Sequence, residues 1–275
     1  MIHFFRAPLA VVGLLLLLIA IAVALCAPII APSDPLDMVG MPLLWPGADS
    51  AHPLGTDSLG RDVLTGLIHG TSASLRIGFS AACISLFLGL MIGSLSGYFG
   101  GAIDRGLMRL TELFQTIPAF LLVVVLVAIY SPTLLVIQFA IGLAAWPEIA
   151  RLARAEFRRL RDYEFVQAAR AAGYSHLHIM LKEILPNAIP TIIVSTSILI
   201  ASAILMESGL AFLGMSDPNI VSWGGMIGVG REHLSSAWFL TAIPGAAIAL
   251  VVLALNLIGD GLNDALNPHL RLGVK

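Results

Sequence analysis

Long apolar runs alternate with shorter polar segments along most of the 275-residue chain. A transmembrane helix needs about 20 predominantly apolar residues, because the hydrocarbon core of a bilayer is roughly 30 Å thick. Six runs approach this length, and we expect each to be a membrane-spanning helix. Their predicted ranges are 9–30, 75–98, 113–130, 134–150, 189–207 and 239–258. The pattern therefore predicts an all-α polytopic membrane protein that forms one transmembrane domain over residues 1–275.

The composition agrees with this pattern and excludes several classes of protein. Hydrophobic residues make up 58% of the chain, charged residues 12%, and the mean hydropathy is +0.93, which lies outside the range of soluble domains. The formal net charge of −2 argues against a nucleic-acid-binding protein. Cys26 and Cys83 both fall in apolar runs, so we expect them to be small buried hydrophobic side chains and not a disulfide.

The basic residues predict the orientation of the spans. With a cytoplasmic N-terminus, only Arg61, Arg76 and Arg231 of the 15 Lys and Arg residues face outward, and the other twelve face the cytoplasm. This is the asymmetry that the positive-inside rule requires. Both termini and the loop 151–188 are then cytoplasmic, and the loops 31–74 and 208–238 are extracytoplasmic.

The cytoplasmic loop begins with a charged helix and then forms a more polar stretch, "EFVQAARAAGYSHLHIMLKEILPN". Arg151, Arg154, Arg158 and Arg161 share one helix face that can meet lipid phosphates or an acidic partner. Further along, Gly173 can adopt the left-handed conformation that ends a helix, and Ser175 can cap a second one.

We expect the stretch to form two short helices joined at Gly173, the second ending near Pro186 where span five begins. The apolar stripe of the second helix comprises Leu177, Met180, Leu181 and Ile184. We expect the chain itself to leave this face uncovered, so that it fits a groove on another protein.

The residues "QAARAAG" and, nine residues later, "EILP" resemble the EAA loop of ABC importer permeases. Gln167 replaces the glutamate of that pattern, and Glu183 occupies its isoleucine position. In that family the loop docks into a cleft of a separate ATPase subunit and transmits its motion. The resemblance assigns this role to Phe165, Val166, Gln167, Ala168, Ala169, Ala172, Gly173, Leu185 and Pro186.

Two further stretches narrow the resemblance to the dipeptide, oligopeptide and nickel permeases, in particular to their C-type subunit. They are "HPLGTDSLGRDVLTGLIHG" (52–70) and "NLIGDGLNDALNPHL" (256–270), with departures at Gly66, Asn263 and Asn267. The resemblance implies the type I ABC importer permease fold in a bacterial inner membrane. It also implies three kinds of partner: a second homologous permease, two ABC ATPase subunits and an extracytoplasmic solute-binding protein. Dipeptides, longer peptides, nickel chelates and other metallophores all remain open as substrates.

The chain lacks the motifs of an energy source or a catalyst. A P-loop needs Gly-Lys-Ser/Thr, but Leu181 precedes Lys182 and the other lysine is Lys275. We therefore expect no catalytic, cofactor or metal site here, with ATP and Mg bound by the partner ATPases. The rival classes are an intramembrane enzyme, which needs a nucleophile or metal motif, and a channel or secondary transporter, which needs mid-span ionisable residues.

Several residues are candidates for contact with substrate or with the binding protein. Ser195, Ser202 and Glu207 interrupt the apolar fifth span and are candidate pathway residues. Glu207 lies about 26 Å along the helix from Pro190, at the predicted outer mouth, where an interfacial carboxylate without a transport role is the alternative. In the outer loops, Trp223 and Arg231 are candidates for docking the binding protein, and Asp57, Arg61 and Asp62 can pair locally.

Gly89, Gly93 and Gly97 recur every four residues in the second predicted span. A small-residue face of this kind lets another helix approach closely. We therefore expect a second helix to pack along these three glycines.

Overall fold

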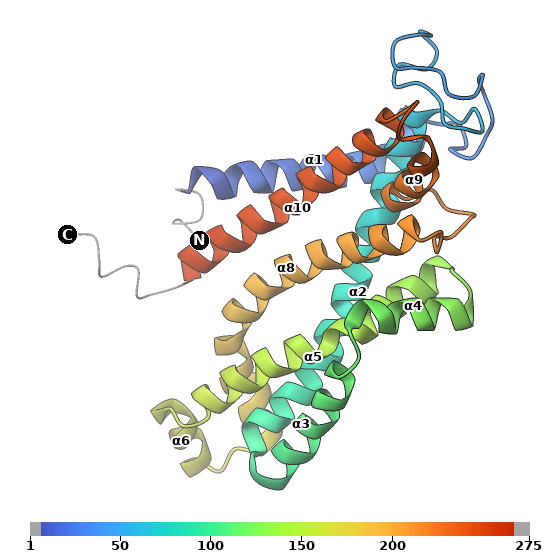
Figure 1. The fold of residues 1–275 in the computed structure, drawn as a ribbon. Coiled ribbons are helices and arrows are strands. Elements are labelled where there is room, and N and C mark those ends of the chain that lie inside the picture. Colours follow the sequence, from blue (N-terminus) through green and yellow to red (C-terminus); the bar gives the residue numbers. More distant parts are fainter. Residues whose placement is uncertain (1–6, 267–275) are drawn as a thin grey trace.

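The computed structural model of the chain describes residues 7–266, and the regular elements in that range are all helical (Figure 1). In chain order they are α1 (Pro8–Ile30), α2 (Val63–Phe99), α3 (Gly101–Gln115), α4 (Ala119–Tyr130), α5 (Leu134–Leu160), α6 (Glu164–Ala171), α7 (His176–His178), the π-helix η2 (Ile179–Ile184), α8 (Leu185–Phe212), α9 (Trp223–Gly230), the 3-10 helix η3 (Arg231–His233) and α10 (Phe239–Leu266). Five helical stretches are long and apolar enough to cross a membrane, and α3 with α4 forms a sixth candidate. Arg6, Arg271 and Lys275, three of the twelve basic residues predicted to face the cytoplasm, lie outside the described residues, as does Asn267.

Most helices extend beyond the predicted spans. The helix that contains 75–98 begins at Val63, so residues 63–74 are helical and not part of an outer loop. At its start the Asp62 carboxylate accepts a hydrogen bond from the Thr65 amide, which caps the helix. Likewise, α5 runs ten residues past the predicted end of its span at 150.

The third predicted span, 113–130, is broken and not one straight helix. The chain breaks between α3 and α4, whose axes differ by 75°. Pro118 lacks an amide hydrogen and disfavours helical backbone at the residue before it, which explains why the helix ends at Gln115. With twelve residues, α4 is about 18 Å long, shorter than the hydrocarbon core of a bilayer.

The predicted glycine face of α2 packs against α5. A Cβ atom at Gly89, Gly93 or Gly97 would lie 2.6 Å from Ile149 Cβ, 2.3 Å from the Ala150 carbonyl oxygen or 2.5 Å from the Arg154 carbonyl oxygen, respectively. Larger side chains would therefore force the helices apart. From the other side, Gly142 of α5 approaches Ile84 and the Ala81 carbonyl in the same way.

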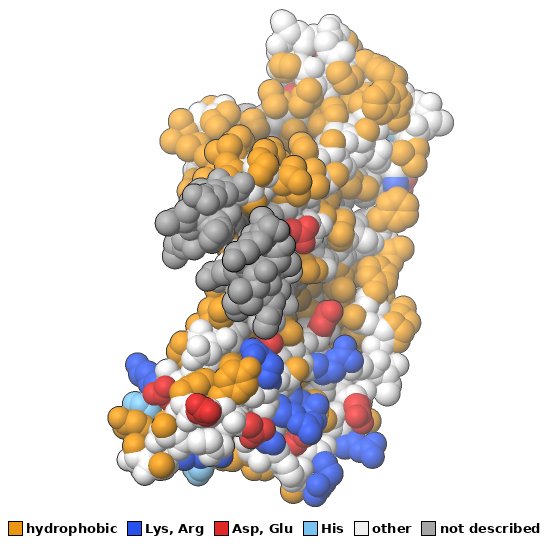
Figure 2. Space-filling view, turned by 90° about the vertical axis from the view of Figure 1, so that its left-hand side faces the viewer, with side chains coloured by type: hydrophobic (Ala, Val, Ile, Leu, Met, Phe, Trp, Pro, Cys, Tyr) orange, Lys and Arg blue, Asp and Glu red, His pale blue; other side chains and the backbone are white. Residues whose placement is uncertain are grey.

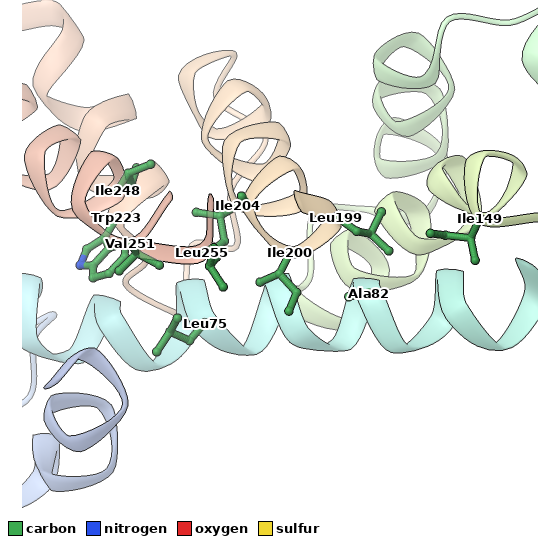
Figure 3. Packing of buried hydrophobic residues seen from close by; sticks show 11 residues of the cluster. Leu75, Ala82, Ile149, Leu199, Ile200, Ile204, Trp223, Ile248, Val251 and Leu255 are labelled. Atoms are coloured by element: carbon green, nitrogen blue, oxygen red, sulfur yellow. The ribbon is translucent and has the colours of Figure 1, made fainter. Parts of the chain in front are cut away.

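The main hydrophobic core follows α2. Figure 3 shows side chains of α5, α8, α9 and α10 arranged along this helix, among them Ile149, Ile204, Trp223 and Val251. Gly78 of α2 allows the close approach of Ile204, because a Cβ there would lie 2.9 Å from the Ile204 side chain. In Figure 1, α1 and α10 run side by side on the outside of this core.

Residues 31–62 form an irregular segment between α1 and α2, which we call the outer cap, at one end of the molecule (Figure 1). Its centre is the fully buried Thr56, whose hydroxyl donates to the Met41 carbonyl at 2.5 Å and accepts from the Leu44 amide at 3.0 Å. Asp62 accepts from His52 Nδ1 at 3.0 Å as well as capping α2. The stretch 52–70, which resembles the permease family, thus contributes residues to a network of hydrogen bonds within the chain.

Charged side chains gather at the other end of the molecule, around α3, α6 and the end of α5 (Figure 2). The outer cap and the middle of the molecule show mostly hydrophobic side chains on the same face. Cys26 and Cys83 are among the exposed side chains, so the expectation that they are buried was wrong. Both lie on helices whose outward faces are apolar, where a small hydrophobic side chain suits a lipid environment.

Candidate functional site

Residues 164–184, which we call the elbow, form the turn predicted from the sequence. Gly173 has φ +80°, the left-handed conformation that ends α6. The Tyr174 amide donates to the Ala169 carbonyl and the Gly173 amide to the Arg170 carbonyl, the two hydrogen bonds of a Schellman motif. Beyond the turn, Ser175 Oγ accepts from the His178 amide and caps α7, as the sequence indicated.

The elbow packs against the ends of α2 and α5. Val166, Ile179 and Ile184 are buried in one cluster with Tyr98 and Phe157. The Tyr98 hydroxyl lies 2.9 Å from His176 Nδ1, and its ring lies beneath the Arg170 guanidinium. The elbow is therefore fixed to the helices that lead into the membrane-spanning core.

The expectation that the chain leaves the apolar face of the elbow uncovered was wrong in part. Met180 and Ile184 of the predicted stripe are buried, because α2 and α5 extend far enough to cover them. Leu177 and Leu181 stay exposed, at 65% and 50%. Among the residues assigned by resemblance, Gln167, Ala168, Ala172, Gly173 and Pro186 are exposed, Phe165 and Leu185 are half-buried, and Val166 and Ala169 are buried.

The second helix of the elbow is not a separate short helix. It runs through the π-helical turn η2 into α8, so that His176–Phe212 forms one helical stretch of 37 residues. Pro186 lies in the first turn of α8, where its missing amide hydrogen does little harm. Just before Pro186, the Leu185 amide donates to the carbonyl of Met180, five residues earlier, which is the hydrogen bond of a π-turn.

The arginines of α5 do not form the free stripe that their spacing suggested. Arg154 makes a two-pronged contact with Asp104 of α3, with Nη2 2.7 Å from Oδ2, and Ser96 Oγ donates to the same carboxylate. The hydrogen bonds from Arg154 lower the pKa of Asp104 to about 2 against the opposing effect of burial. Arg161 donates to the Gly97 carbonyl. Two of the four arginines therefore join α5 to neighbouring segments.

Glu207 does not lie at an open mouth. Its side chain is 2% exposed between α8 and α9, and Ser222 Oγ donates to its Oε1 at 2.6 Å. The other carboxylate oxygen has no hydrogen-bond partner among the described residues and packs against Gly224, where a Cβ would lie 2.6 Å from it. In this structure Glu207 joins two helices and does not line a passage.

The two outer-loop candidates also differ from expectation. Trp223 is 3% exposed, and its indole Nε1 donates to the Leu67 carbonyl of α2, so its side chain does not form a docking surface here. The half-buried Arg231 donates to the Phe212 carbonyl. The outer aromatic surface instead comes from Trp45 and Trp238, which lie edge to face and are each about half exposed. Sequence reasoning did not single these out.

The expected local pairing in the outer cap takes another form. Asp57 accepts hydrogen bonds from the amides of Leu59 and Arg61, at 2.8 and 2.9 Å, and not from the Arg61 side chain. The Nε of Arg61 is buried without a partner among the described residues. Asp57 thus stabilises a turn, whereas Asp62 caps α2.

The serines on α8 separate into different surroundings. Ser195 is half-buried, whereas Ser202 is exposed to a cavity of about 420 Å³ between α8, α5 and the α3–α4 break. Gln115, Glu148 and Arg151 line the same cavity. None of these three residues was predicted to line a cavity, although a carboxylate inside an apolar run such as 134–150 is the signal that could have found Glu148. Within residues 7–266, no three His, Cys, Asp or Glu side chains come together as a metal site requires.

Comparison with known proteins adds to this geometry. Residues 89–272 match the model of the binding-protein-dependent transport system inner membrane component, and residues 1–46 match that of the N-terminal TM domain of oligopeptide transport permease C. A di/tripeptide transport system permease protein DppC from Pseudomonas aeruginosa is 40% identical over 94% of this chain and 88% of its own. The dipeptide transport system permease protein DppC of Haemophilus influenzae is 38% identical over 95% and 91%.

Solved structures show the same architecture at low sequence identity. An inward-facing structure of the MetNI methionine ABC transporter aligns with a TM-score of 0.61 at 19% identity, covering 74% of this chain and 96% of that one. An amino acid ABC transporter gives a TM-score of 0.55 at 16% identity, over 72% and 92%. The all-α, type I ABC importer permease fold is thereby confirmed. The chain belongs to the binding-protein-dependent transport system inner membrane components and, within them, to the peptide permeases of the DppC/OppC type, which are transport subunits.

Proposed function

We propose that the chain is one of two permease subunits that together form the passage of an ATP-driven importer of short peptides in the bacterial inner membrane. A solute-binding protein delivers the peptide at the outer cap, and two ATPase subunits, which bind ATP and Mg, act on the elbow. The names of the relatives, a di/tripeptide and a dipeptide permease, support peptides as the substrate class. Both termini and loop 151–188 face the cytoplasm, an orientation that the charged end around the elbow supports.

The surface of the elbow is the observation on which this proposal depends. Ala168 and Ala172 are exposed before the turn at Gly173, and Leu177 and Leu181 are exposed after it, so the elbow presents both small side chains and two leucines outward. A surface of this kind suits insertion into a groove of another protein, because apolar area is removed from water without a clash. Since the elbow continues into α8, a partner that moves it also moves the helix that borders the 420 Å³ cavity.

The opposite end of the molecule offers a surface for the solute-binding protein. Trp45 and Trp238 lie together there, with Met41 of the outer cap also exposed. Aromatic and methionine side chains are enriched in protein interfaces. We assign the docking role to this surface and no longer to the buried Trp223.

The experiment that tests the coupling role places charge on the elbow. The double variant Ala168→Glu, Ala172→Glu in the complete assembly should lose peptide uptake and binding-protein-stimulated ATP hydrolysis by about 100-fold, because burying unpaired charge costs about 3 kcal/mol or more. Both residues are exposed in the chain alone, so expression and thermal stability should not change.

The control is Ala155→Glu, the same substitution at an exposed position on α5 outside the elbow. It should retain uptake and stimulated hydrolysis. If the double variant kept both activities at normal expression, the elbow would not be the coupling element.

A further inference from the structure

The strongest unassigned feature is the 420 Å³ cavity between α5, α8 and the α3–α4 break. We propose that it binds the substrate on its way through the membrane, with Glu148 recognising the free ammonium group of a short peptide and Arg151 its free carboxylate. This inference rests on the proposed function and names the residues that contact the peptide backbone.

Four polar side chains at the cavity have no partner within the described part of the chain. Gln115, Glu148, Arg151 and Ser202 all line the cavity, and none makes a side-chain hydrogen bond or ion pair within the described part of the chain. Glu148 and Arg151 are one helical turn apart on α5, yet they do not pair with each other. All four side chains are exposed, so the cavity offers a carboxylate, a guanidinium, an amide and a hydroxyl to a molecule that enters it.

The backbone is broken at the wall of the cavity that α3 and α4 form. Gln115, Ile117, Pro118 and Ala119, at the α3–α4 break, form one wall of the cavity. Irregular backbone at membrane depth is tolerated where it borders a water-filled space or is buried in protein. The break is a feature of the backbone and is therefore a separate observation from the unpaired side chains. The N-terminus of the twelve-residue α4 also opens onto the cavity, and its positive end favours a carboxylate.

The size and chemistry of the cavity fit a di- or tripeptide. Ligand pockets commonly measure about 300 to 1,000 Å³. An extended dipeptide separates its terminal charges by roughly 7 Å, a distance that long Glu and Arg side chains one turn apart can span by diverging. Arg151 can hold a carboxylate through two parallel hydrogen bonds, and Glu148 is the matching partner for an ammonium group.

Part of the remaining wall is small or flexible, namely Ala81, Ala144, Ala145, Ala203 and Met206. The rest is apolar and bulkier, with Phe114, Ile141 and Leu199. Alanines leave room for peptide side chains of different size, and methionine adapts its shape to them. The cavity would therefore recognise what all short peptides share, their charged termini, and tolerate what differs.

The test uses a cysteine placed in the cavity of the complete assembly. In a background with Cys26→Ala and Cys83→Ala, which removes the two exposed thiols, Ser202→Cys should react with a water-soluble maleimide. Leu205→Cys, on an exposed apolar part of the same helix, should react much more slowly. Millimolar alanyl-alanine, without binding protein, should protect Ser202→Cys from the reagent.

Modified peptides then identify the charged partners. Glu148→Gln should weaken protection by alanyl-alanine about tenfold but leave protection by the N-acetylated peptide unchanged, because that peptide has no ammonium group. Arg151→Gln should weaken protection by the free acid about tenfold but leave protection by the C-terminal amide unchanged, because the amide has no carboxylate. Glu112→Gln and Arg109→Gln are the matched controls, since this exposed pair on α3 lies outside the cavity. Both should leave protection by every peptide unchanged.

Each outcome has a separate meaning. Failure of the unmodified assembly to import any short peptide overturns the proposed function itself. Normal import with an unreactive Ser202→Cys, or with protection that Glu148→Gln and Arg151→Gln leave unchanged, overturns only the binding site. Protection by alanyl-alanine is then measured in vesicles with and without phosphatidylethanolamine, to distinguish a peptide site from a site for a zwitterionic lipid headgroup. Protection lost when that lipid is present would show that the site belongs to lipid.

Discussion

The outer cap and the elbow each contain a stretch of sequence that resembles the permease family, yet the two stretches use their residues differently. In the outer cap Thr56, His52 and Asp62 form hydrogen bonds within the chain, and Thr56 is fully buried. In the elbow Ala168 and Ala172 face outward and contact little of their own chain. A distinctive sequence can thus specify either an internal network or a surface, and only burial and bonding tell the two apart.

Two glycines make this comparison quantitative. Gly55 in the outer cap and Gly173 in the elbow have the same φ of +80°. A Cβ at Gly55 would lie 2.2 Å from the Leu44 carbonyl oxygen, whereas a Cβ at Gly173 would have nothing within 4 Å. The backbone strain of an alanine is therefore the same at both sites, and only the packing differs.

The largest expected effect is that of Gly55→Ala. It adds a clash with backbone to the cost of the left-handed conformation, so we expect a loss of stability of more than about 3 kcal/mol and poor recovery of folded protein. Thermal unfolding in detergent measures this. A loss no greater than that of Gly173→Ala would mean that the outer cap rearranges freely around the new methyl group.

Gly173→Ala should cost less, about 1 to 2 kcal/mol, because only the backbone conformation opposes it. Gly173→Asn should cost less again, since asparagine tolerates the left-handed region. In the complete assembly we expect Gly173→Ala to lower peptide uptake more than its stability loss explains, because the turn positions the exposed surface of the elbow. Equal uptake by both variants and the unchanged protein would show that the turn geometry is not needed for transport.

The smallest effect concerns the ion pair near the elbow. Replacement of Asp104 by asparagine should cost about 1 kcal/mol or less at neutral pH, because the pair is partly exposed. The pKa of Asp104 is lowered from 3.8 to about 2 in the folded protein, so the stability it adds is present above about pH 4 and declines as the pH falls through 2. The stability difference between Asp104→Asn and the unchanged protein should therefore shrink between pH 5 and pH 2. A constant difference would indicate that the pair contributes through packing and not through charge.

The features predicted correctly from the sequence are those set by local or periodic signals. Five of the six apolar runs correspond to long helices, Gly173 forms the expected turn, and Ser175 caps the helix after it. The glycine spacing of α2 also predicted a close helix contact. Each of these depends on neighbouring residues or on one helix face, which a single sequence displays directly.

The features missed depend on contacts between distant segments. Burial of Met180 and Ile184 requires α2 and α5 to extend past the predicted spans, which hydropathy alone does not show. Glu207 and Ser222 meet only because α9 folds back onto α8. The cavity residues Glu148 and Gln115 come together through a break at Pro118 that the apolar run concealed. Such pairings follow from tertiary packing and leave little trace in composition or periodicity.

The unbroken stretch from His176 to Phe212 has a mechanical consequence. At 1.5 Å per residue its 37 residues span about 55 Å, so the stretch can act as a lever between the charged end and the opposite end of the molecule. Its fulcrum is the contact with Gly78 of α2, where Ile204 leaves no room for sliding. Ile204 lies near the Phe212 end, so the arm toward the charged end is roughly 42 Å long and the other arm roughly 12 Å. A wide movement at the charged end is therefore converted into a small and correspondingly more forceful one at the far end.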